Sequence, residues 1–196
     1  MSSSVSAGDG AEEASRARVR CAWGKFNELA PIITSRGASL KLKGRIYKTC
    51  VQSVLVYGSE TWAMKAEDKQ RLERTERAMI RWMCGKTLKD QINSEVLRRC
   101  LDIESVTEIV RKSRLRWFGH LERKEEDDWV SACRKLKVEG KRDRGRPNKT
   151  WNDCVEEDMR EYCLNKNMTQ DRALWRSVIH GNRPTCASTK KRTLKR

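Results

Sequence analysis

The sequence has no apolar run that approaches the roughly 20 residues needed to span a bilayer, and its start lacks the apolar core of a secretory signal. We therefore predict no membrane partner and an intracellular protein, nuclear or cytoplasmic, that is not secreted. No segment shows the alternation of apolar and polar residues that indicates a half-buried strand, and no internal repeat is evident. These absences favour an all-α protein.

Close cysteine pairs are also missing. The eight cysteines are spread along the chain without the Cys-X-X-Cys spacing that structural zinc sites usually need. We expect them to be free thiols in a reducing compartment, most of them buried. One set could in principle surround a metal ion: Cys154, Cys163, His180 and Cys186. Because the spacing of this set matches no common zinc module, we predict neither a metal site nor a cofactor.

Acidic residues are scarce relative to basic ones. The chain has 27 Asp and Glu against 43 Lys and Arg, which gives a net charge of +16. Such an excess favours a polyanion, because each neutralised phosphate releases counterions. RNA, an RNA–DNA hybrid and duplex DNA are therefore the expected partners. Since 37% of the residues are hydrophobic and 36% are charged, the helices must keep broad polar faces and the core should consist of narrow seams.

Turn signals and shifts in composition divide the chain into six segments. In order they are a flexible leader at residues 1–10, a helical subdomain at 11–85, connecting helices at 86–138, a basic linker at 139–149, C-terminal helices at 150–181 and a basic tail at 182–196. The expected architecture is a helical bundle followed by a second, small helical subdomain, with disordered termini.

Several residues predict where helices begin and end. Pro31 should stop the helix that starts at residue 11, Gly85 should cap the helix at residues 66–84, and Gly181 should end the last helix. Ser105 and Glu108 have the spacing of a capping box, in which each side chain accepts a backbone N–H of the first turn. The other expected N-caps are Ser39, Asn93 or Ser94, Thr150 and Thr169.

Two apolar stripes should face the core. The stripe of a helix over residues 39–62 recurs at every fourth position: Leu42, Ile46, Cys50, Val54, Gly58 and Trp62. The stripe of the helix after Ser105 has these members: Val106, Ile109, Val110, Trp117 and Leu121. We expect most of the seven tryptophans in the core, with Trp117 and Trp151 the best candidates for stacking on nucleic-acid bases. His120 should pack or cap, since no catalytic partner is placed near it by the sequence.

Three motifs carry a resemblance to a known family: residues 53–62 (SVLVYGSETW), 114–123 (RLRWFGHLER) and 144–147 (RGRP). In this order, with a glycine-bearing turn and an Arg-rich helix before them, they resemble the region that follows the polymerase palm in LINE-type (non-LTR) retrotransposon reverse transcriptases. The resemblance extends from about residue 2 to residue 195. It implies that residues 11–85 form a thumb, a helical bundle that grips the template–primer duplex through its backbone.

The same resemblance implies that the isolated chain is catalytically inactive. In that family the palm's metal-bound aspartates carry out RNA-directed DNA synthesis. The palm lies outside this chain, and so would the Mg²⁺ of the parent polymerase. Some family members carry an endonuclease with a Pro-Asp step, where this chain has Pro147 and Asn148. Asparagine cannot supply an anionic metal ligand, so we expect no nuclease activity.

Basic helix faces would, on this resemblance, hold phosphates without reading sequence. The first two faces are Lys41, Arg45 and Lys48, and Arg74, Arg77 and Arg81. Further candidates are Arg114 and Arg116 and, in the basic linker, Arg142, Arg144, Arg146 and Lys149. The linker also resembles an AT-hook, in which Arg-Gly-Arg lies in a narrow minor groove. An ordinary solvated surface, or a nuclear-import patch for the linker, is the alternative.

Two other functions stay open at this point. The chain could be a protein-interaction module whose apolar seams pair with the missing palm or with another chain. It could also be a non-functional remnant of a decayed mobile element. Salt dependence separates the first alternative from nucleic-acid binding, because phosphate contacts weaken steeply as salt rises whereas an apolar interface hardly responds.

Overall fold

The computed structural model describes residues 9–125, 128–130 and 149–181, and all regular elements in these ranges are helical. The α-helices are α1 (Asp9–Ile33), α2 (Leu40–Ile46), α3 (Ser53–Leu55), α4 (Ala66–Met83), α5 (Ser94–Leu101), α6 (Val106–Glu122), α8 (Trp151–Glu161) and α9 (Arg172–His180). A π-helical turn, η1 (Tyr47–Gln52), joins α2 to α3, and 3-10 turns occupy Ser59–Thr61, Leu88–Asp90 and Lys166–Thr169. The predicted all-α fold is thus confirmed for the described residues.

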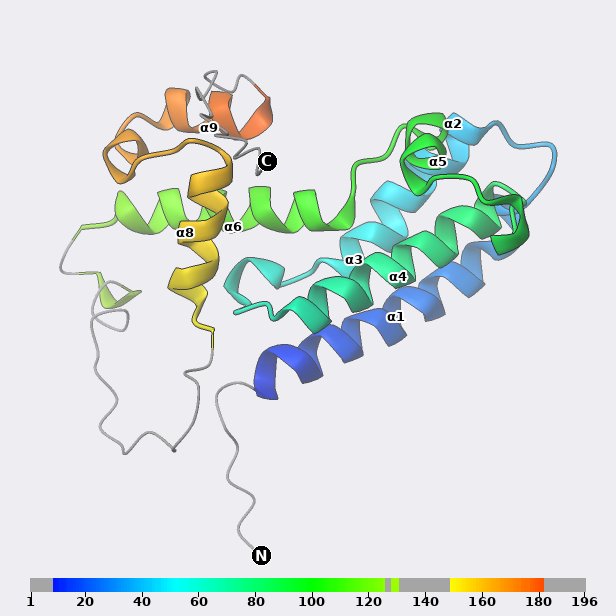
Figure 1. The fold of residues 1–196 in the computed structure, drawn as a ribbon, viewed down its shortest axis with the longest axis horizontal. Helices are drawn as coiled ribbons and strands as arrows, with labels where there is room; N and C mark the ends of the chain where they lie inside the picture. The colour runs from blue at the N-terminus through cyan, green and yellow to red at the C-terminus, as the bar shows by residue number, and fades with distance from the viewer. Residues whose placement is uncertain (1–8, 126–127, 131–148, 182–196) are drawn as a thin grey trace, which may run out of the picture.

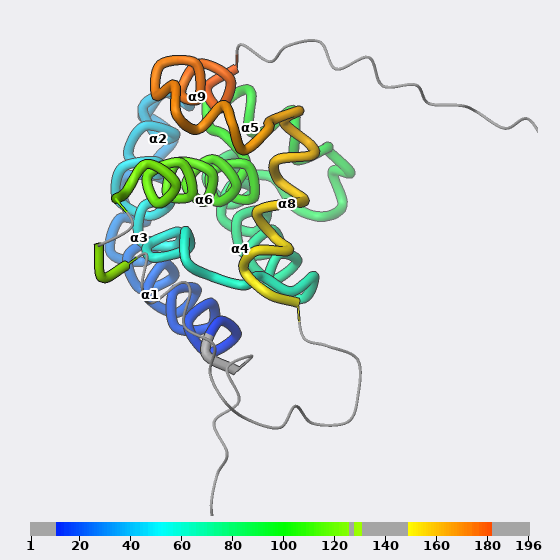
Figure 2. Tube along the Cα trace, turned by 90° about the vertical axis from the view of Figure 1, so that its left-hand side faces the viewer, coloured from blue at the N-terminus to red at the C-terminus, as the bar shows by residue number. Residues whose placement is uncertain are grey.

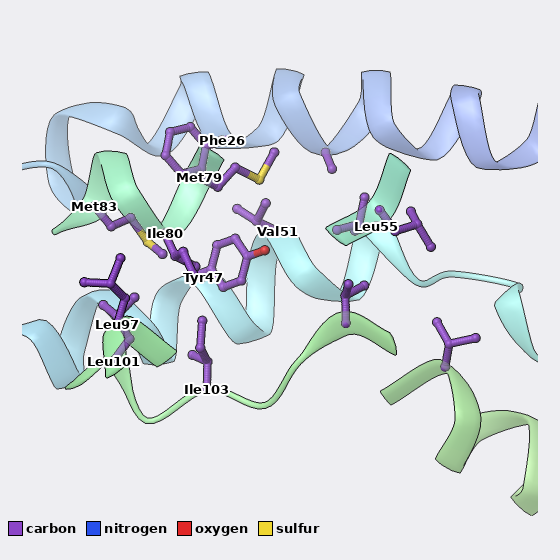
Figure 3. Packing of buried hydrophobic residues seen from close by; sticks show 14 of the residues in the cluster. Phe26, Tyr47, Val51, Leu55, Met79, Ile80, Met83, Leu97, Leu101 and Ile103 are labelled. Carbon is purple, nitrogen blue, oxygen red and sulfur yellow. The ribbon is translucent and has the colours of Figure 1, made fainter. Parts of the chain in front are cut away.

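The first hydrophobic cluster lies between α1, α4 and the run of turns from α2 to α3. Figure 1 shows α1 and α4 side by side, with α5 and α2 at their far end. Phe26 from α1, Met79 and Ile80 from α4, Tyr47 and Val51 are all fully buried in this cluster (Figure 3). α5 and the start of α6 complete it, so the cluster extends past residue 85.

The second hydrophobic cluster forms where the remainder of α6 meets α8 and α9. Its largest members are Phe118, Trp175 and Tyr162, each almost completely buried. The indole N–H of Trp175 donates to the carbonyl of Leu115 (3.0 Å), which fixes α9 against α6. Gly119 lets the two helices approach, because a Cβ there would lie 2.3 Å from Trp175 Nε1. α6 therefore belongs to both clusters. Figure 2, which looks nearly along α6, shows α9 above this helix and α3 and α4 below it.

The first helix does not stop at Pro31, as predicted, but continues to Ile33. Pro31 lacks the backbone N–H that would donate to the carbonyl of Asn27, and that carbonyl belongs to an exposed residue. The next turn still closes, since the N–H of Thr34 donates to the carbonyl of Ala30 (2.9 Å). Full burial of Ile33 holds this last turn against the core.

The predicted helix over residues 39–62 is shorter and faces the core differently. Ser39 is its N-cap, as expected, but the α-helical and π-helical turns end at Leu55 and the chain turns at Gly58, whose φ is +75°. The buried face is Lys43, Gly44, Tyr47, Val51 and Leu55, one residue away from the predicted stripe. The apolar pattern predicts the wrong face because glycine carries no apolar side chain to mark the contact. α5 packs on Gly44, where a Cβ would lie 1.8 Å from the Leu101 carbonyl oxygen.

The capping box predicted for Ser105 and Glu108 does not form. Ser105 is the N-cap residue of α6, but its hydroxyl pairs with that of Thr107. Glu76 of α4 instead accepts the N–H of Val106 (2.9 Å), and is itself held by Arg98 (3.0 Å). A carboxylate from another helix thus supplies the negative charge that favours a helix N-terminus.

The remaining helix ends are mostly as predicted. Gly85 and Gly181 follow α4 and α9 with φ of +64° and +130°. Thr150 caps α8 in a reciprocal capping box with Asp153. Thr169 was expected to cap α9, but it lies in a 3-10 turn and Asp171 is the cap, accepting from the N–H groups of Ala173 and Leu174.

Candidate nucleic-acid interface

A basic groove runs between α6 and α9. Its first part is a hollow of about 430 Å³, and its polar lining is entirely of residues that carry or can carry positive charge: Arg116, His120, Arg123, Arg172 and Arg176. Trp175, which is almost completely buried, also lines it. The lining includes no carboxylate, and no ion pair within the described residues engages these four arginines. Repulsion among close cations is relieved when an anion binds, so this hollow suits phosphate.

The groove continues past Arg116 into a second hollow of about 280 Å³. Here Lys112 and Arg116 of α6 face Lys48 of η1 and His180 at the end of α9. Glu104 is the carboxylate that lines this part, and it pairs with Lys112. Since Arg116 belongs to both hollows, we call the two together the α6–α9 groove. Both histidines of the chain, His120 and His180, lie along it.

Helical periodicity explains how α6 builds this groove. Lys112, Arg116, His120 and Arg123 follow one another at intervals of four, four and three residues, so their side chains share one face of the helix. Arg172 and Arg176 share a face of α9 for the same reason. The opposite faces of the two helices are occupied by the buried members of the second cluster. Packing of α9 on α6 therefore brings the two basic faces together.

A second groove lies at the C-terminal end of α4 and has a volume of about 630 Å³. Arg74, Arg77 and Arg81 line one side of it, which confirms that they share a face. Trp82 and Leu88 also line it, and both are unusually exposed for large apolar side chains. We call this hollow the α4 groove. It lies at the opposite end of the long axis from α9 (Figure 1).

The predicted phosphate-binding residues do not form one surface. Lys48 and Arg116 both line the α6–α9 groove, although they lie far apart in the sequence. Lys41 and Arg45 are exposed on α2 but line neither groove. Arg81 is partly committed to structure, since its guanidinium donates to the carbonyls of Thr87 (2.8 Å) and Ile92 (3.0 Å).

Arg114 is not available as a surface contact. It is 4% exposed and its guanidinium pairs with the carboxylate of Asp158 on α8 at 2.7 Å. Burial is the largest influence on Asp158 and raises its pKa, while Arg114 and Arg111 oppose that rise. Removing Asp158 would leave the buried guanidinium of Arg114 without this ion pair, which is costly. We therefore remove Arg114 from the set of candidate phosphate ligands.

Lys149 is the residue of the basic linker that the structure describes. Lys149, just before α8, forms an ion pair with Glu157 (2.5 Å) in the middle of that helix. Arg142, Arg144 and Arg146 lie outside the described residues, as do the predicted minor-groove motif, residues 1–8 of the predicted leader and the tail at 182–196. The last two residues of the predicted leader belong to α1, which begins at Asp9. Their binding roles stay predictions.

Sequence reasoning missed four basic residues of the α6–α9 groove: Lys112, Arg123, Arg172 and Arg176. The spacing of Lys112, Arg116 and Arg123 was a usable signal, because it predicts one basic face on α6. The contribution of α9 was not predictable from local pattern, since it depends on how the second cluster packs.

The tryptophans differ from expectation in which ones reach solvent. Trp62 and Trp175 are buried, in agreement with a core role. Trp151, expected as an exception, is half-buried and donates its indole N–H to the carbonyl of Glu60 (2.7 Å). The most exposed are instead Trp82 at 51% and Trp129 at 74%.

The described cysteines are free thiols, but only Cys154 among them is buried. Burial raises the pKa of the Cys154 thiol, so it stays protonated. Within the described ranges no cluster of three or more His, Cys, Asp and Glu could hold a metal ion. Cys186 of the set considered above lies outside them.

Comparison with known proteins gives one informative similarity. The chain is 25% identical over 177 residues to a transposon-derived protein of Caenorhabditis elegans, an alignment that covers 84% of this chain. The chain spans 63% of the length of that relative. No protein-family model matches the chain, and no solved structure matches it significantly. Among the described helices, none combines the length and the apolar character required to cross a membrane.

Proposed function

We propose that the chain is a part of a mobile-element reverse transcriptase that binds nucleic acid through the phosphate backbone and is catalytically inactive by itself. Similarity to a transposon-derived protein supports a mobile-element origin. The motifs at residues 53–62 and 114–123 support the more specific assignment to the region after the polymerase palm. In the parent enzyme this region would help to hold template RNA and primer during reverse transcription.

The α6–α9 groove is the observation that carries the binding proposal. Four arginines, two lysines and two histidines from three separate elements line it, against one carboxylate, which is already paired. Phosphate contacts of this kind add affinity without sequence preference. RNA, an RNA–DNA hybrid and duplex DNA are all compatible ligands, since each presents a row of phosphates.

The test compares two triple variants that remove the same charge. R116A/R172A/R176A takes three arginines from the α6–α9 groove. The control, R16A/K25A/R99A, takes three exposed cations whose head groups already pair with Glu12, Glu28 and Glu95. Binding of the full chain to labelled duplex DNA, RNA–DNA hybrid and single-stranded RNA would be measured by fluorescence anisotropy across a salt series.

The groove variant should bind at least about tenfold more weakly at low salt, and the slope of log affinity against log salt should fall by about 2 to 3. The change in log affinity caused by the control variant should be less than half of that caused by the groove variant. Equal effects of the two variants would show that net charge, not the groove, drives binding. Absence of binding by well-folded wild-type protein at low salt would remove the proposal altogether.

A protein-interaction module is the second candidate function, and the exposed Trp82 and Leu88 favour it. Large apolar side chains that stay exposed often mark contact surfaces. Salt separates this candidate from the first, because an interface built on these two side chains would hold at high salt.

A further inference from the structure

The α4 groove combines features that the phosphate-binding proposal does not use. Trp82 is 51% exposed and Leu88 77% exposed, yet both lie in a hollow whose charged residues are all basic. Leaving this apolar surface in water is unfavourable in the isolated chain. The groove therefore suits a ligand that carries negative charge and also has an apolar or flat aromatic part.

The ring of Trp82 is held in place from behind. Its centroid lies 5.4 Å from that of Phe26, which is fully buried, and 6.5 Å from that of Trp23. Aromatic neighbours at these distances stabilise each other beyond simple burial. The ring of Trp82 is thus packed against Trp23 and Phe26, which restricts its rotation although half of it is exposed.

The other side of the groove is also tied down. Arg81 bridges from α4 to the carbonyls of Thr87 and Ile92, so the loop that carries Leu88 is fastened to the helix. Asp90, the nearest carboxylate in that loop, is turned toward the N–H of Thr87 (2.6 Å) and does not line the groove. The bond from Thr87 lowers the pKa of Asp90. The loop's own negative charge is therefore already engaged.

The cations of the groove stand beside the aromatic ring. Arg77 and Arg74 lie about one and two turns, respectively, before Trp82 on α4, and Lys86 follows the turn at Gly85. Arg77 has no ion pair with any described carboxylate, and Arg74 bonds only to the neutral side chain of Gln70. Proteins that bind single strands combine a positive groove with an aromatic face on which bases stack.

We infer that the α4 groove binds an unpaired nucleotide of a single-stranded RNA or DNA, with the base stacked on Trp82 and the adjoining phosphates at Arg77 and Lys86. This inference rests on the proposed nucleic-acid binding and adds a second, chemically different site. The α6–α9 groove holds phosphates of any strand, whereas the α4 groove requires an exposed base. A duplex satisfies the first site and not the second.

The experiment uses the full chain and changes ligand and protein independently. The ligands are a short single strand, the same strand with abasic sites throughout, and a duplex of equal length. The variants are W82A, the conservative W82F, and R77A, with W129A as the control because Trp129 is 74% exposed and lines neither groove. Circular dichroism confirms that each variant is folded.

Wild-type protein should bind the single strand about tenfold more tightly than the abasic strand, since stacking one base contributes a factor of this order. W82A should lose that preference while its binding to duplex and to the abasic strand stays unchanged. W82F should retain most of the preference, R77A should weaken both single strands alike, and W129A should match wild type. Because the abasic strand tests the ligand side, the result does not depend on how W82A folds.

Equal binding of normal and abasic strands by the wild type would overturn the inference, as would a W82A variant with an unchanged preference. Displacement by an acidic amphipathic peptide, without any single-strand preference, would assign the groove to a protein partner instead. In either case the duplex binding of the α6–α9 groove would stand, so the proposed function would survive. Loss of all nucleic-acid binding in the wild type would refute both.

Discussion

The two hydrophobic clusters both depend on a glycine and a buried ion pair, but they use them differently. In the first cluster Gly44 meets the backbone of α5, and Glu76 joins Arg98, Gln52 and the first N–H of α6. In the second, Gly119 meets only the side chain of Trp175, while Asp158 joins two arginines. Backbone contacts cannot move aside, whereas a side chain can. The first cluster should therefore tolerate change less well than the second.

Size supports the same distinction. Among the described residues the first cluster contains seventeen buried apolar side chains and the second contains nine. The second cluster nevertheless positions every arginine of the α6–α9 groove, because α6 and α9 meet through Trp175. The part of the molecule with the smaller core thus carries the proposed phosphate site. Mutations there should affect binding before they affect global stability.

The largest effect expected is for Gly44→Ala. The new Cβ would lie 1.8 Å from the carbonyl oxygen of Leu101, so α2 and α5 must separate. We expect the free energy of unfolding, measured by urea denaturation, to fall by about 3 kcal/mol or more. This is at the upper end of the usual cost of an overpacked core. Gly24→Ala is the control, since no atom lies within 4 Å of its Cβ and alanine favours the helix. A G44A variant as stable as G24A would contradict the close crossing.

A smaller effect is expected for Gly119→Ala in the second cluster. Its Cβ would lie 2.3 Å from Trp175 Nε1, but the indole can shift at the cost of its bond to Leu115. We expect about 1 to 2 kcal/mol of destabilisation. Nucleic-acid binding should weaken as well, because displacement of α9 moves Arg172 and Arg176 away from Arg116. Unchanged nucleic-acid binding in a destabilised G119A variant would show that the groove does not depend on the contact between Gly119 and Trp175.

Local signals in the sequence predicted the fold class and most helix ends. Some helix ends depend only on a residue's own backbone or on a residue three positions away, as at Gly85, Thr150 and Gly181. Such ends can be predicted from the local sequence. The predicted capping box at Ser105 does not form: the Ser105 hydroxyl pairs with that of Thr107, and the carboxylate at this helix start comes from Glu76, thirty positions before Val106. Arg114 was misassigned because its partner lies forty-four positions along the chain. Hydrophobic pattern does not record such pairings.

The candidate site was predictable to a similar extent. The basic faces of α4 and α6 follow from helical spacing, and the shared face of Arg74, Arg77 and Arg81 is confirmed. The meeting of Lys48 with Arg116 required the tertiary fold, as did the exposure of Trp82 in place of Trp151. Charge and periodicity therefore identify which surfaces are basic, while packing decides which of them form a groove.

The smallest predicted effect concerns pH and the buried carboxylate of the first cluster. Burial is the dominant influence on Glu76 and raises its pKa above the ordinary 4.5, although Arg98 and the N–H of Val106 oppose the rise. Between 4.5 and the raised value the folded protein then holds more protons than the unfolded chain. Stability contributed by this group should consequently fall as pH rises through that window.

Comparison of wild type with Glu76→Gln isolates this contribution, because glutamine keeps an acceptor for the N–H of Val106 but does not titrate. Urea denaturation between pH 4.5 and neutrality should show the stability of wild type falling relative to E76Q as pH rises. Glu67→Gln, at an exposed position of the same helix, should leave the pH profile unchanged. A difference that instead grows in favour of wild type with rising pH would mean that Arg98 and the α6 N-terminus outweigh burial. The ionised carboxylate of Glu76 would then stabilise the folded first cluster.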